Sequence, residues 1–449
     1  MGFVRTIFVS RARRASIHTL CALALLSATA GAAHDRVDDA IGNWRSAIST
    51  QNRGDGVAQS ASDVPVQTGR TVSQPPTSSY GARRFSEVYS VTWDDIPVAE
   101  ATPADPDITA AISIANDGTI AGKQGDTLVL WHPDTRMWER VPKALAPTSV
   151  FISPDGSSVL ASDGSRPPDP ANIVTWNRMS GWQTLAGSTA TNSEAKSVSR
   201  NFRFAVGGGI NPGEPAQAWV WAIDGGTQHL LPTPDFANSA IASAVSDDGN
   251  IVIGYTVLAG DNDWPVLIAV RWVGGGPPTI LRAPDGSELA GVIACNSDCS
   301  IVFGANNWFL KDNGEFGFLG TLPDADPDPH GTYYAQDASS DGSVVAGLYM
   351  QNADPANPTS GTYNDRPYLW TSATGMTSLR SLSTELGVGD EDWGSIDLVR
   401  LSPDGRRILI RGDRASGQPR TVVLHLTSRA VRLDSGHSTH ARPTPPRTN

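Results

Sequence analysis

Four acidic stretches hold the side chains best suited to chemistry, and three of them lie beside an aromatic or histidine residue. They are Asp261 and Asp263 with Trp264; Asp324, Asp326 and Asp328 with His330; the segment 352–365; and Asp390 and Asp392 with Trp393. A glycosidase needs two carboxylates about 5–10 Å apart beside a sugar-stacking aromatic residue. Asp263 with Trp264 and Asp392 with Trp393 are the local candidates for such a site.

Alternating aspartates also offer oxygen ligands to Ca²⁺. The stretch from Asp324 to Asp328 lacks the glycine and the distal glutamate of a helix-loop-helix calcium site, and Pro327 and Pro329 stiffen it. A solvated loop, or a surface that recognises a basic or polyhydroxyl partner, fits the same residues. We therefore predict no resident metal or cofactor, with Ca²⁺ as the candidate if one binds.

Motifs typical of enzymes are missing from the chain. It contains no Gly-x-Ser-x-Gly nucleophile elbow, no His-Glu-x-x-His and no phosphate-binding loop. His132, His229 and His425 are expected as exposed strand or turn residues, and His437 and His440 fall in a tail where weak metal binding is the alternative to disorder. We predict a protein that is not an enzyme and has no catalytic residues.

The elements that must position the acidic stretches come from a repeated phrase. Its clearest copy is Ala335 to Gly347, in which Asp341-Gly342 separates two apolar-alternating runs, as in a β-hairpin. Related turns occur at Asn116-Asp117-Gly118, Pro154-Asp155-Gly156, Arg200-Asn201-Phe202, Asp247-Asp248-Gly249, Ser297-Asp298-Cys299 and Pro403-Asp404-Gly405. Repeats of about 40–50 residues made of strands alone are typical of propeller blades.

Each repeat predicts four strands. In the fourth copy, Ile241–Ser246 precedes the turn, Ile251–Gly254 follows it, the third strand ends at Trp272 and the fourth contains Thr279–Leu281. The repeated tryptophan suits packing between blades better than a sugar-stacking platform, because a four-stranded blade must bury both faces against its neighbours. The sequence therefore predicts an all-β, seven-bladed β-propeller over residues 85–434, with eight blades as the alternative count.

Ring closure is expected from the two ends of the repeat region. The segment Val88–Trp93 resembles an outer strand, and the last repeat ends in Thr421–Leu426. We predict that these two segments pair, so that an N-terminal strand completes the last blade and removes its open edges. We call the four strands of a blade a, b, c and d in chain order. The loops between strands b and c and those between d and the next a share one face of a propeller, and the acidic stretches fall on those loops.

The segment before the repeats predicts export. Residues 1–33 combine four arginines, an apolar core from Leu20 to Leu26 and small residues at positions 30–33, as in a cleaved signal peptide. A membrane anchor is the alternative, but the apolar core is shorter than the roughly 20 residues of a spanning helix. Residues 34–84 are expected to be a disordered linker and residues 435–449 a disordered tail.

The net charge indicates which partners the protein can bind, and the cysteines indicate the cellular compartment. The formal charge of −12 would become −16 after removal of residues 1–33, and such a surface repels nucleic acid. Cys295 and Cys299 flank the fifth turn, and in an oxidising compartment they are expected to form a disulfide rather than a metal site. We expect a periplasmic, secreted or cell-surface protein without a membrane span after cleavage.

The unit Ala-x-x-x-Ser-x-Asp-Gly-x-x-Val-x-Gly, followed by Leu-Trp-Thr and Gly-Met, runs from Ala335 to Leu379 and resembles the HAF repeat of bacterial extracellular, autotransporter-associated proteins. The segments Leu386–Trp393, Leu401–Gly405 and Ile408–Gly412 are similar to the usual end of such arrays. The resemblance implies an exported β-propeller of largely undefined function, and it carries over no catalytic residues.

Two classes of function follow. The first is a monomeric, non-catalytic binding or scaffold module that recognises a protein or polysaccharide through its acidic, loop-rich face. The second is a carbohydrate-active or other hydrolytic enzyme that uses carboxylate pairs on that face.

Overall fold

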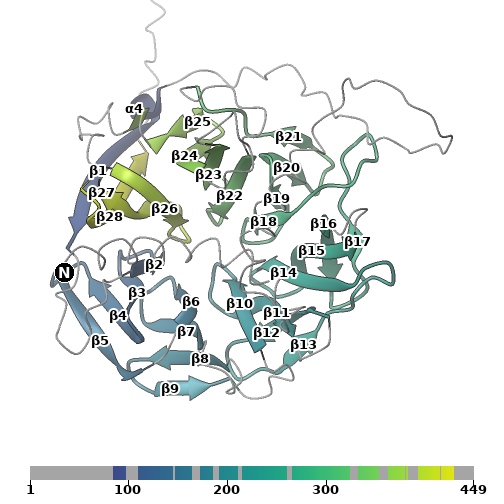
Figure 1. The fold of residues 1–449 in the computed structure, drawn as a ribbon, viewed down its shortest axis with the longest axis horizontal. Coiled ribbons are helices and arrows are strands. Elements are labelled where there is room, and N and C mark those ends of the chain that lie inside the picture. Colours follow the sequence, from purple (N-terminus) through teal and green to yellow (C-terminus); the bar gives the residue numbers. More distant parts are fainter. Residues whose placement is uncertain are drawn as a thin grey trace, which may run out of the picture.

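The apolar runs on either side of each Asp-Gly turn form the first two strands of a four-stranded antiparallel sheet. In this computed structural model, seven such sheets stand around one axis and make a seven-bladed β-propeller (Figure 1). The structure describes residues 84–97, 110–144, 147–163, 172–185, 192–210, 215–259, 265–323, 332–352, 363–379, 381–382, 393–414 and 416–428. The predicted signal peptide, the predicted tail and the predicted linker apart from Arg84 lie outside these residues.

The strands of the first four blades follow the chain in order. Blade 1 contains β2 (Ala110–Ile114), β3 (Ile120–Gln124), β4 (Thr127–His132) and β5 (Met137–Ala144). Blade 2 contains β6 (Pro147–Ile152), β7 (Ser158–Asp163), β8 (Asn172–Asn177) and β9 (Gly181–Thr184). Blade 3 contains β10 (Asn192–Val198), β11 (Phe204–Ile210), β12 (Gln217–Ala222) and β13 (Gln228–Leu230). Blade 4 contains β14 (Ser239–Val245), β15 (Ile251–Ala259), β16 (Pro265–Val273) and β17 (Thr279–Ile280).

The remaining blades complete the ring. Blade 5 contains β18 (Val292–Cys295), β19 (Ile301–Gly304), β20 (Trp308–Lys311) and β21 (Phe316–Phe318). Blade 6 contains β22 (Thr332–Ala338), β23 (Val344–Asn352), β24 (Tyr363–Thr371) and β25 (Gly375–Ser378). Blade 7 contains β26 (Trp393–Leu401), β27 (Arg407–Arg414), β28 (Pro419–Ser428) and, from the N-terminal side, β1 (Tyr89–Ile96), which follows the short helix α4 (Phe85–Val88).

The predicted closure is confirmed. Strand β1 pairs with β28 along its whole length, with Tyr89 opposite Ser428 and Ile96 opposite Thr421. Phe85 of α4 is buried among side chains of blades 6 and 7. The beginning and the end of the propeller are therefore held in one sheet, and that sheet has no strand missing at its outer edge.

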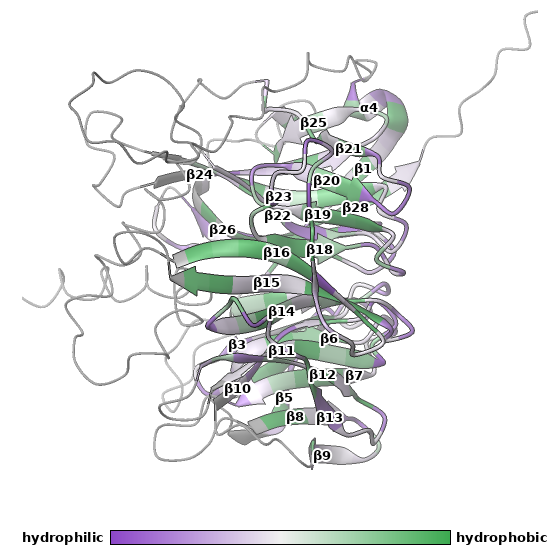
Figure 2. Cartoon of the chain, turned by 90° about the vertical axis from the view of Figure 1, so that its right-hand side faces the viewer, coloured by the Kyte–Doolittle hydropathy of each residue, from purple (hydrophilic) through white to green (hydrophobic). Residues whose placement is uncertain are grey.

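Apolar side chains fill the spaces between blades. Seven clusters of buried residues each join two neighbouring blades, and the edge-on view shows apolar strands stacked through the ring (Figure 2). The third-strand tryptophans belong to this core; they are Trp131, Trp176, Trp221, Trp272, Trp308 and Trp370, none of them more than 7% exposed. The prediction that they pack between blades is confirmed. Among the described residues, no helix has the length and apolarity to cross a membrane.

The Asp-Gly turns are built by hydrogen bonds within the turn. In blade 4 the Ser246 hydroxyl donates to Asp248 Oδ1 at 2.6 Å, and the amide of Asn250 donates to the same oxygen at 2.9 Å. The same hydroxyl accepts the amide of Ile251 at 2.9 Å. These hydrogen bonds, the Ser246 hydroxyl first among them, hold the pKa of Asp248 below its usual range.

Hydrogen bonds also join each turn to the next blade, from blade 3 round to blade 2. They run from Asn201 N to Asp247 Oδ1, Asp247 N to Ser297 O, Ser297 N to Ser340 O, Ser340 N to Pro403 O, Asp404 N to Asn116 Oδ1 and Asn116 N to Pro154 O, at 2.7 to 2.9 Å. Residues of these turns, through their backbones and through the Asp247 and Asn116 side chains, therefore hold neighbouring blades together.

Ser246→Ala should destabilise the protein in a pH-dependent way. Because the folded pKa of Asp248 is lowered, its contribution is present above the unfolded value near pH 4 and is lost as the pH falls through the folded pKa. We expect a cost of about 1–2 kcal/mol at pH 7, measured by urea unfolding, and a smaller cost at pH 3.

The matched background is Asp248→Asn, since blade 3 already carries asparagine at this position and Asn201 accepts the Ser199 hydroxyl at 2.8 Å. In that background the cost of Ser246→Ala should no longer depend on pH. An equal pH dependence in both backgrounds would assign the effect to another group.

The turn of blade 5 carries the predicted disulfide. Cys295 and Cys299 are bonded, with their Cα atoms 5.0 Å apart. Five turns place glycine at positive φ, and these residues are Gly118, Gly156, Gly249, Gly342 and Gly405. Cys299 occupies the same position with a φ of 53°, and Phe202 does so in blade 3 with a φ of 62°. Both residues hold a conformation that normally favours glycine.

Cysteine replacement separates the disulfide from the backbone strain. Cys295→Ala/Cys299→Gly should be more stable than Cys295→Ala/Cys299→Ala by about 1 kcal/mol, because glycine relieves the positive φ while both variants lack the disulfide. Urea unfolding measures the difference. The control places the glycine in strand β18: Cys295→Gly/Cys299→Ala should be the least stable of the three, and the reverse order would refute the assignment.

Candidate functional site

The first strand of each blade faces the propeller axis. Strands β2, β6, β10, β14, β18, β22 and β26 contact one another around the ring and enclose a cavity of about 820 Å³ along the axis (Figure 1). This channel is our candidate functional site, because a concave space of this size with converging polar groups is where a propeller can enclose a ligand.

A β-bulge in the inner strand of each of blades 1 to 6 supplies a residue to the channel. The pairing of the first two strands skips one residue in each of blades 1 to 6: Ile112, Thr148, Lys196, Ser243, Ile293 and Gln336. In blade 7 it skips two residues, Gly394 and Asp397. The six residues of blades 1 to 6 line the cavity. A bulge re-aims side chains, and here it directs them toward the axis.

The bulges explain the glycine that ends the repeated Val-x-Gly phrase. In blade 6, Gly347 pairs with Ala335, directly before the bulged Gln336. A side chain on Gly347 would collide with the backbone oxygen of Tyr334 and with the Tyr368 ring. Gly122, Gly207, Gly254, Gly304 and Gly412 occupy the same register position in blades 1, 3, 4, 5 and 7.

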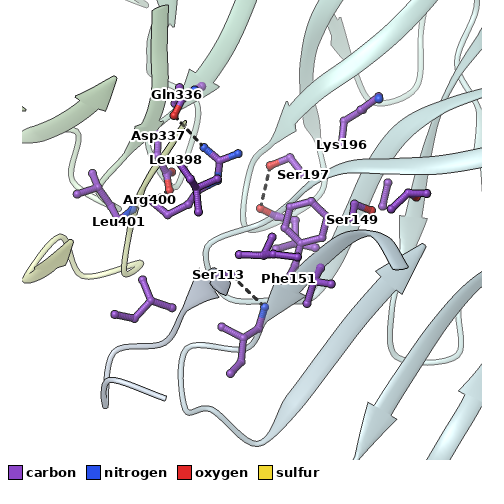
Figure 3. A pocket seen from close by; sticks show the side chains of 18 of the residues that line it. Ser113, Ser149, Phe151, Lys196, Ser197, Gln336, Asp337, Leu398, Arg400 and Leu401 are labelled. Carbon is purple, nitrogen blue, oxygen red and sulfur yellow. Dashed lines mark hydrogen bonds between the residues drawn. The ribbon is translucent and has the colours of Figure 1, made fainter. Parts of the chain in front are cut away.

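Polar and apolar side chains divide the channel wall. The polar part includes Lys196 and Ser197 of β10, and Gln336 and Arg400 of β22 and β26 (Figure 3). The Arg400 guanidinium donates to the amide oxygen of Gln336 at 3.5 Å and to the backbone oxygen of Val399 at 3.2 Å. The apolar part includes Ile112, Phe151, Ile293 and Leu398.

An ion pair crosses the channel near the a–b turns. Arg200 Nη2 of the blade 3 turn donates to Asp337 Oδ1 of blade 6 at 2.6 Å. The second oxygen of Asp337 accepts the amide of Leu401 at 3.0 Å. The two side chains are 17% and 12% exposed, so blades that lie far apart along the chain are joined by a largely buried contact.

Two charged hairpin ends stand at the other side of the cavity. Lys123 and Asp126 come from the b–c hairpin of blade 1, and Arg411 and Asp413 come from blade 7. Arg411 Nη1 donates to the backbone oxygen of Ala111 at 2.8 Å, and Lys123 Nζ lies 3.5 Å from that of Pro147.

Most of the site residues suggested by the sequence lie outside the described residues. These are Asp261, Asp263, Trp264, Asp324, Asp326, Asp328, His330, Asp390 and Asp392. Trp393 is described: it begins β26, is half-buried against the core of blade 7, and the Arg420 guanidinium lies 4.8 Å from its ring centre. The acidic face stays a prediction.

The described histidines lie in strands, as predicted, but of the three only His229 is exposed, whereas His132 and His425 are half-buried. His132 Nε2 is 2.7 Å from Glu139 Oε2, His425 Nε2 is 2.9 Å from Asp94 Oδ2, and His229 Nε2 is 3.2 Å from the Thr227 hydroxyl. Within the described ranges, no three His, Cys, Asp or Glu side chains gather closely enough to hold a metal ion. Calcium binding by the acidic loops is a prediction about other residues.

Sequence comparisons give no family. No protein-family model matches the chain, and no curated protein matches it. The resemblance to the HAF repeat therefore stays a prediction.

Solved propellers are similar in outline. The β-propeller domain of the Trilobed protease from Pyrococcus furiosus is 10% identical, with 71% of this chain and 96% of that chain covered and a TM-score of 0.49. An oligogalacturonate lyase from Vibrio parahaemolyticus is 12% identical, with 75% of this chain and 97% of that chain covered and a TM-score of 0.42. A putative TolB from Agrobacterium tumefaciens is 14% identical, with 77% of this chain and 99% of that chain covered and a TM-score of 0.38. We draw no conclusion about activity from similarities this low.

Asp337→Asn should destabilise the protein by about 3 kcal/mol, because it leaves the largely buried Arg200 charge without its ionised partner. The double variant Arg200→Gln/Asp337→Asn should recover part of this loss, as measured by urea unfolding. The exposed pair Arg282–Glu288 is the control, and Glu288→Gln should cost less than about 1 kcal/mol. If Asp337→Asn and Glu288→Gln cost the same, the cross-channel ion pair adds no more to the stability than an exposed ion pair does.

Proposed function

We propose that the protein is an exported, non-catalytic binding module that takes a small molecule into its central channel. The observation that carries the proposal is the cavity of about 820 Å³ between the seven inner strands. Pockets for small molecules and cofactors usually have volumes of about 300–1,000 Å³ and combine apolar walls with a few converging polar groups. The channel has this size and this mixture of side chains.

The bulged inner strands support recognition of a particular ligand. The bulges place several kinds of side chain on an otherwise repeated framework, so that Lys196, Ser243 and Gln336 stand at equivalent positions in three blades. The framework is held by backbone pairing and blade packing. A ligand would therefore meet a wall whose polar groups are already in place, which lowers the entropic cost of binding.

Binding fits the lining better than catalysis does. Among the residues that the structure describes, the carboxylates that line the cavity are Asp126, Asp337 and Asp413. Asp337 is held by Arg200 and by the backbone of Leu401, and the other two are exposed at hairpin ends of different blades. The alternative of a carbohydrate-active enzyme depends on the acidic loops and stays a separate hypothesis.

Export is part of the proposal. In residues 1–33 four arginines precede an apolar core, which suggests a signal peptide, and the Cys295–Cys299 disulfide fits an oxidising compartment.

The test combines a ligand screen with a variant that fills the channel. The mature protein is screened against a library of small metabolites by thermal shift, since a ligand that binds the folded state raises the melting temperature. Ser243→Trp places a large ring at a bulged channel position. We expect compounds that stabilise the wild type to lose their effect in this variant.

Thr135→Trp is the matched control, because Thr135 is exposed in the c–d turn of blade 1. It should keep every thermal shift of the wild type. Compounds that stabilise Ser243→Trp and the wild type equally would place the binding surface elsewhere, and the channel proposal would be wrong. If the wild type hydrolyses a bound compound, the proposal that the protein is non-catalytic is wrong.

A further inference from the structure

Hydroxyl groups line the part of the channel that the first four blades form. Ser113 of β2, Thr148 of β6, Ser197 of β10 and Ser243 of β14 all border the cavity. A hydroxyl has one hydrogen to donate and two lone pairs that accept, so its remaining capacity depends on the bonds that it already makes. Those bonds therefore indicate what kind of ligand this part of the wall can hold.

Two of the hydroxyls have a hydrogen to give to a ligand. Ser113 Oγ accepts the amide of Ile152 at 3.3 Å, and its own hydrogen has no acceptor among the described residues. Ser243 makes no hydrogen bond to any described residue, although its side chain borders the cavity. Both can donate into the channel.

The other two hydroxyls have lone pairs to offer. Ser197 donates to the backbone oxygen of Val198 at 3.3 Å, and Thr148 donates to that of Ser162 at 3.4 Å. Their own oxygens can each accept a hydrogen bond from a ligand. The wall thus presents neutral donors and neutral acceptors together, and this combination matches ligand hydroxyl groups, which donate and accept at the same atom.

The basic side chains of the described lining already have partners. Arg200 binds Asp337 across the channel. Lys196 Nζ lies 2.6 Å from Glu194 Oε2, and the other basic groups donate to backbone or amide oxygens. The remaining carboxylates of that lining are exposed at hairpin ends, where water and salt screen them. A charged ligand would have to compete with these partners, whereas a neutral ligand would leave them in place.

Phe151 supplies an aromatic ring beside the hydroxyls. Its half-buried ring packs against the cluster that contains Ala195 of β10, and it directly precedes Ile152, whose amide binds Ser113 (Figure 3). The ring and the hydroxyls of Ser113 and Ser197 therefore belong to one continuous part of the wall, from blade 1 to blade 3.

A sugar suits this combination of an aromatic ring and neutral hydroxyls. The C–H groups on the face of a sugar can cover an aromatic ring, while the hydroxyl groups at its edge form hydrogen bonds. A purely apolar ligand would cover the ring but would leave the wall hydroxyls without water and without partners, which costs free energy.

From these observations we infer that the channel binds a neutral mono- or disaccharide, whose hydroxyl groups bond to Ser113, Ser197 and Ser243 and whose ring lies against Phe151. This inference rests on the proposed function and names the class of ligand for the same cavity.

The test compares neutral sugars with compounds that lack one of their properties. The neutral sugars are glucose, galactose, maltose and cellobiose. Glucuronate and glucosamine add a negative or a positive charge, and cyclohexanol keeps a six-membered ring with a single hydroxyl. We expect titration calorimetry to show that at least one neutral sugar binds at least about tenfold more tightly than cyclohexanol, since two further hydrogen bonds of ordinary strength are worth about that factor. Neither charged compound should bind more tightly than that sugar.

Channel variants locate the binding. Ser243→Ala removes a hydroxyl on which no described residue depends, so it should weaken binding of that sugar about threefold to tenfold and leave the urea midpoint unchanged. Phe151→Leu keeps an apolar side chain but removes the flat ring, and it should weaken binding by a similar factor. Thr135→Ala is the matched control, because it removes an exposed hydroxyl from the c–d turn of blade 1, and it should leave the affinity unchanged.

The outcomes distinguish the two proposals. Sugar binding that Ser243→Ala and Thr135→Ala leave equally strong would overturn the sugar inference. If a charged sugar, cyclohexanol or a library compound binds more tightly than every neutral sugar, and Ser243→Trp blocks its binding, the binding module stands and the ligand class is wrong. If no compound depends on the channel, both proposals fail.

Discussion

The contact that the rest of the propeller depends on is the close approach of the first two strands of each blade at a glycine. In six blades a glycine of the second strand pairs with the residue just before a bulge in the first strand. A side chain at Gly254 would meet the backbone oxygen of Ile241, and one at Gly207 would meet that of Glu194. Glycine lets the backbones come together, and the bulge then turns one residue toward the axis.

Blade packing and channel chemistry are therefore separable. The alternating residues of the inner strands bury one set of side chains between blades, and these are small or apolar, such as Ala195, Ala242 and Ala335. The bulged residue takes no part in the pairing with the second strand, so it is free to vary between lysine, serine, glutamine and isoleucine. A repeated sequence can thus enclose a channel that has no sevenfold symmetry in its chemistry.

Much of the fold could be predicted from the sequence because its signals are local. The Asp-Gly turns, the third-strand tryptophans and the pairing of the N-terminal strand with Thr421–Leu426 all appear as expected. Even the degenerate turns at Asn201 and Asp298 keep the hairpin, since Phe202 and Cys299 accept the positive φ of the missing glycine. Local turn chemistry and burial period are visible in one chain without any knowledge of distant contacts.

The channel could not be predicted in the same way. Lys196, Gln336 and Arg400 look like ordinary polar residues of half-buried strands, and a bulge has no signature within the strand that contains it. A usable signal lies in the partner strand: the glycine of Val-x-Gly marks the bulge opposite it. The contact between Arg200 and Asp337 spans 137 positions of the chain, and no periodic pattern connects them.

That contact also bears on how many blades the ring contains. Most contacts in a propeller join blades that are neighbours, so a blade could be gained or lost by duplication or deletion with only local repair. The Arg200–Asp337 pair acts as a chord, because it links blades 3 and 6 across the axis. A ring of six or eight blades would change the diameter and the angle that this chord must span. In evolutionary terms, the pair ties the repeat array to a count of seven.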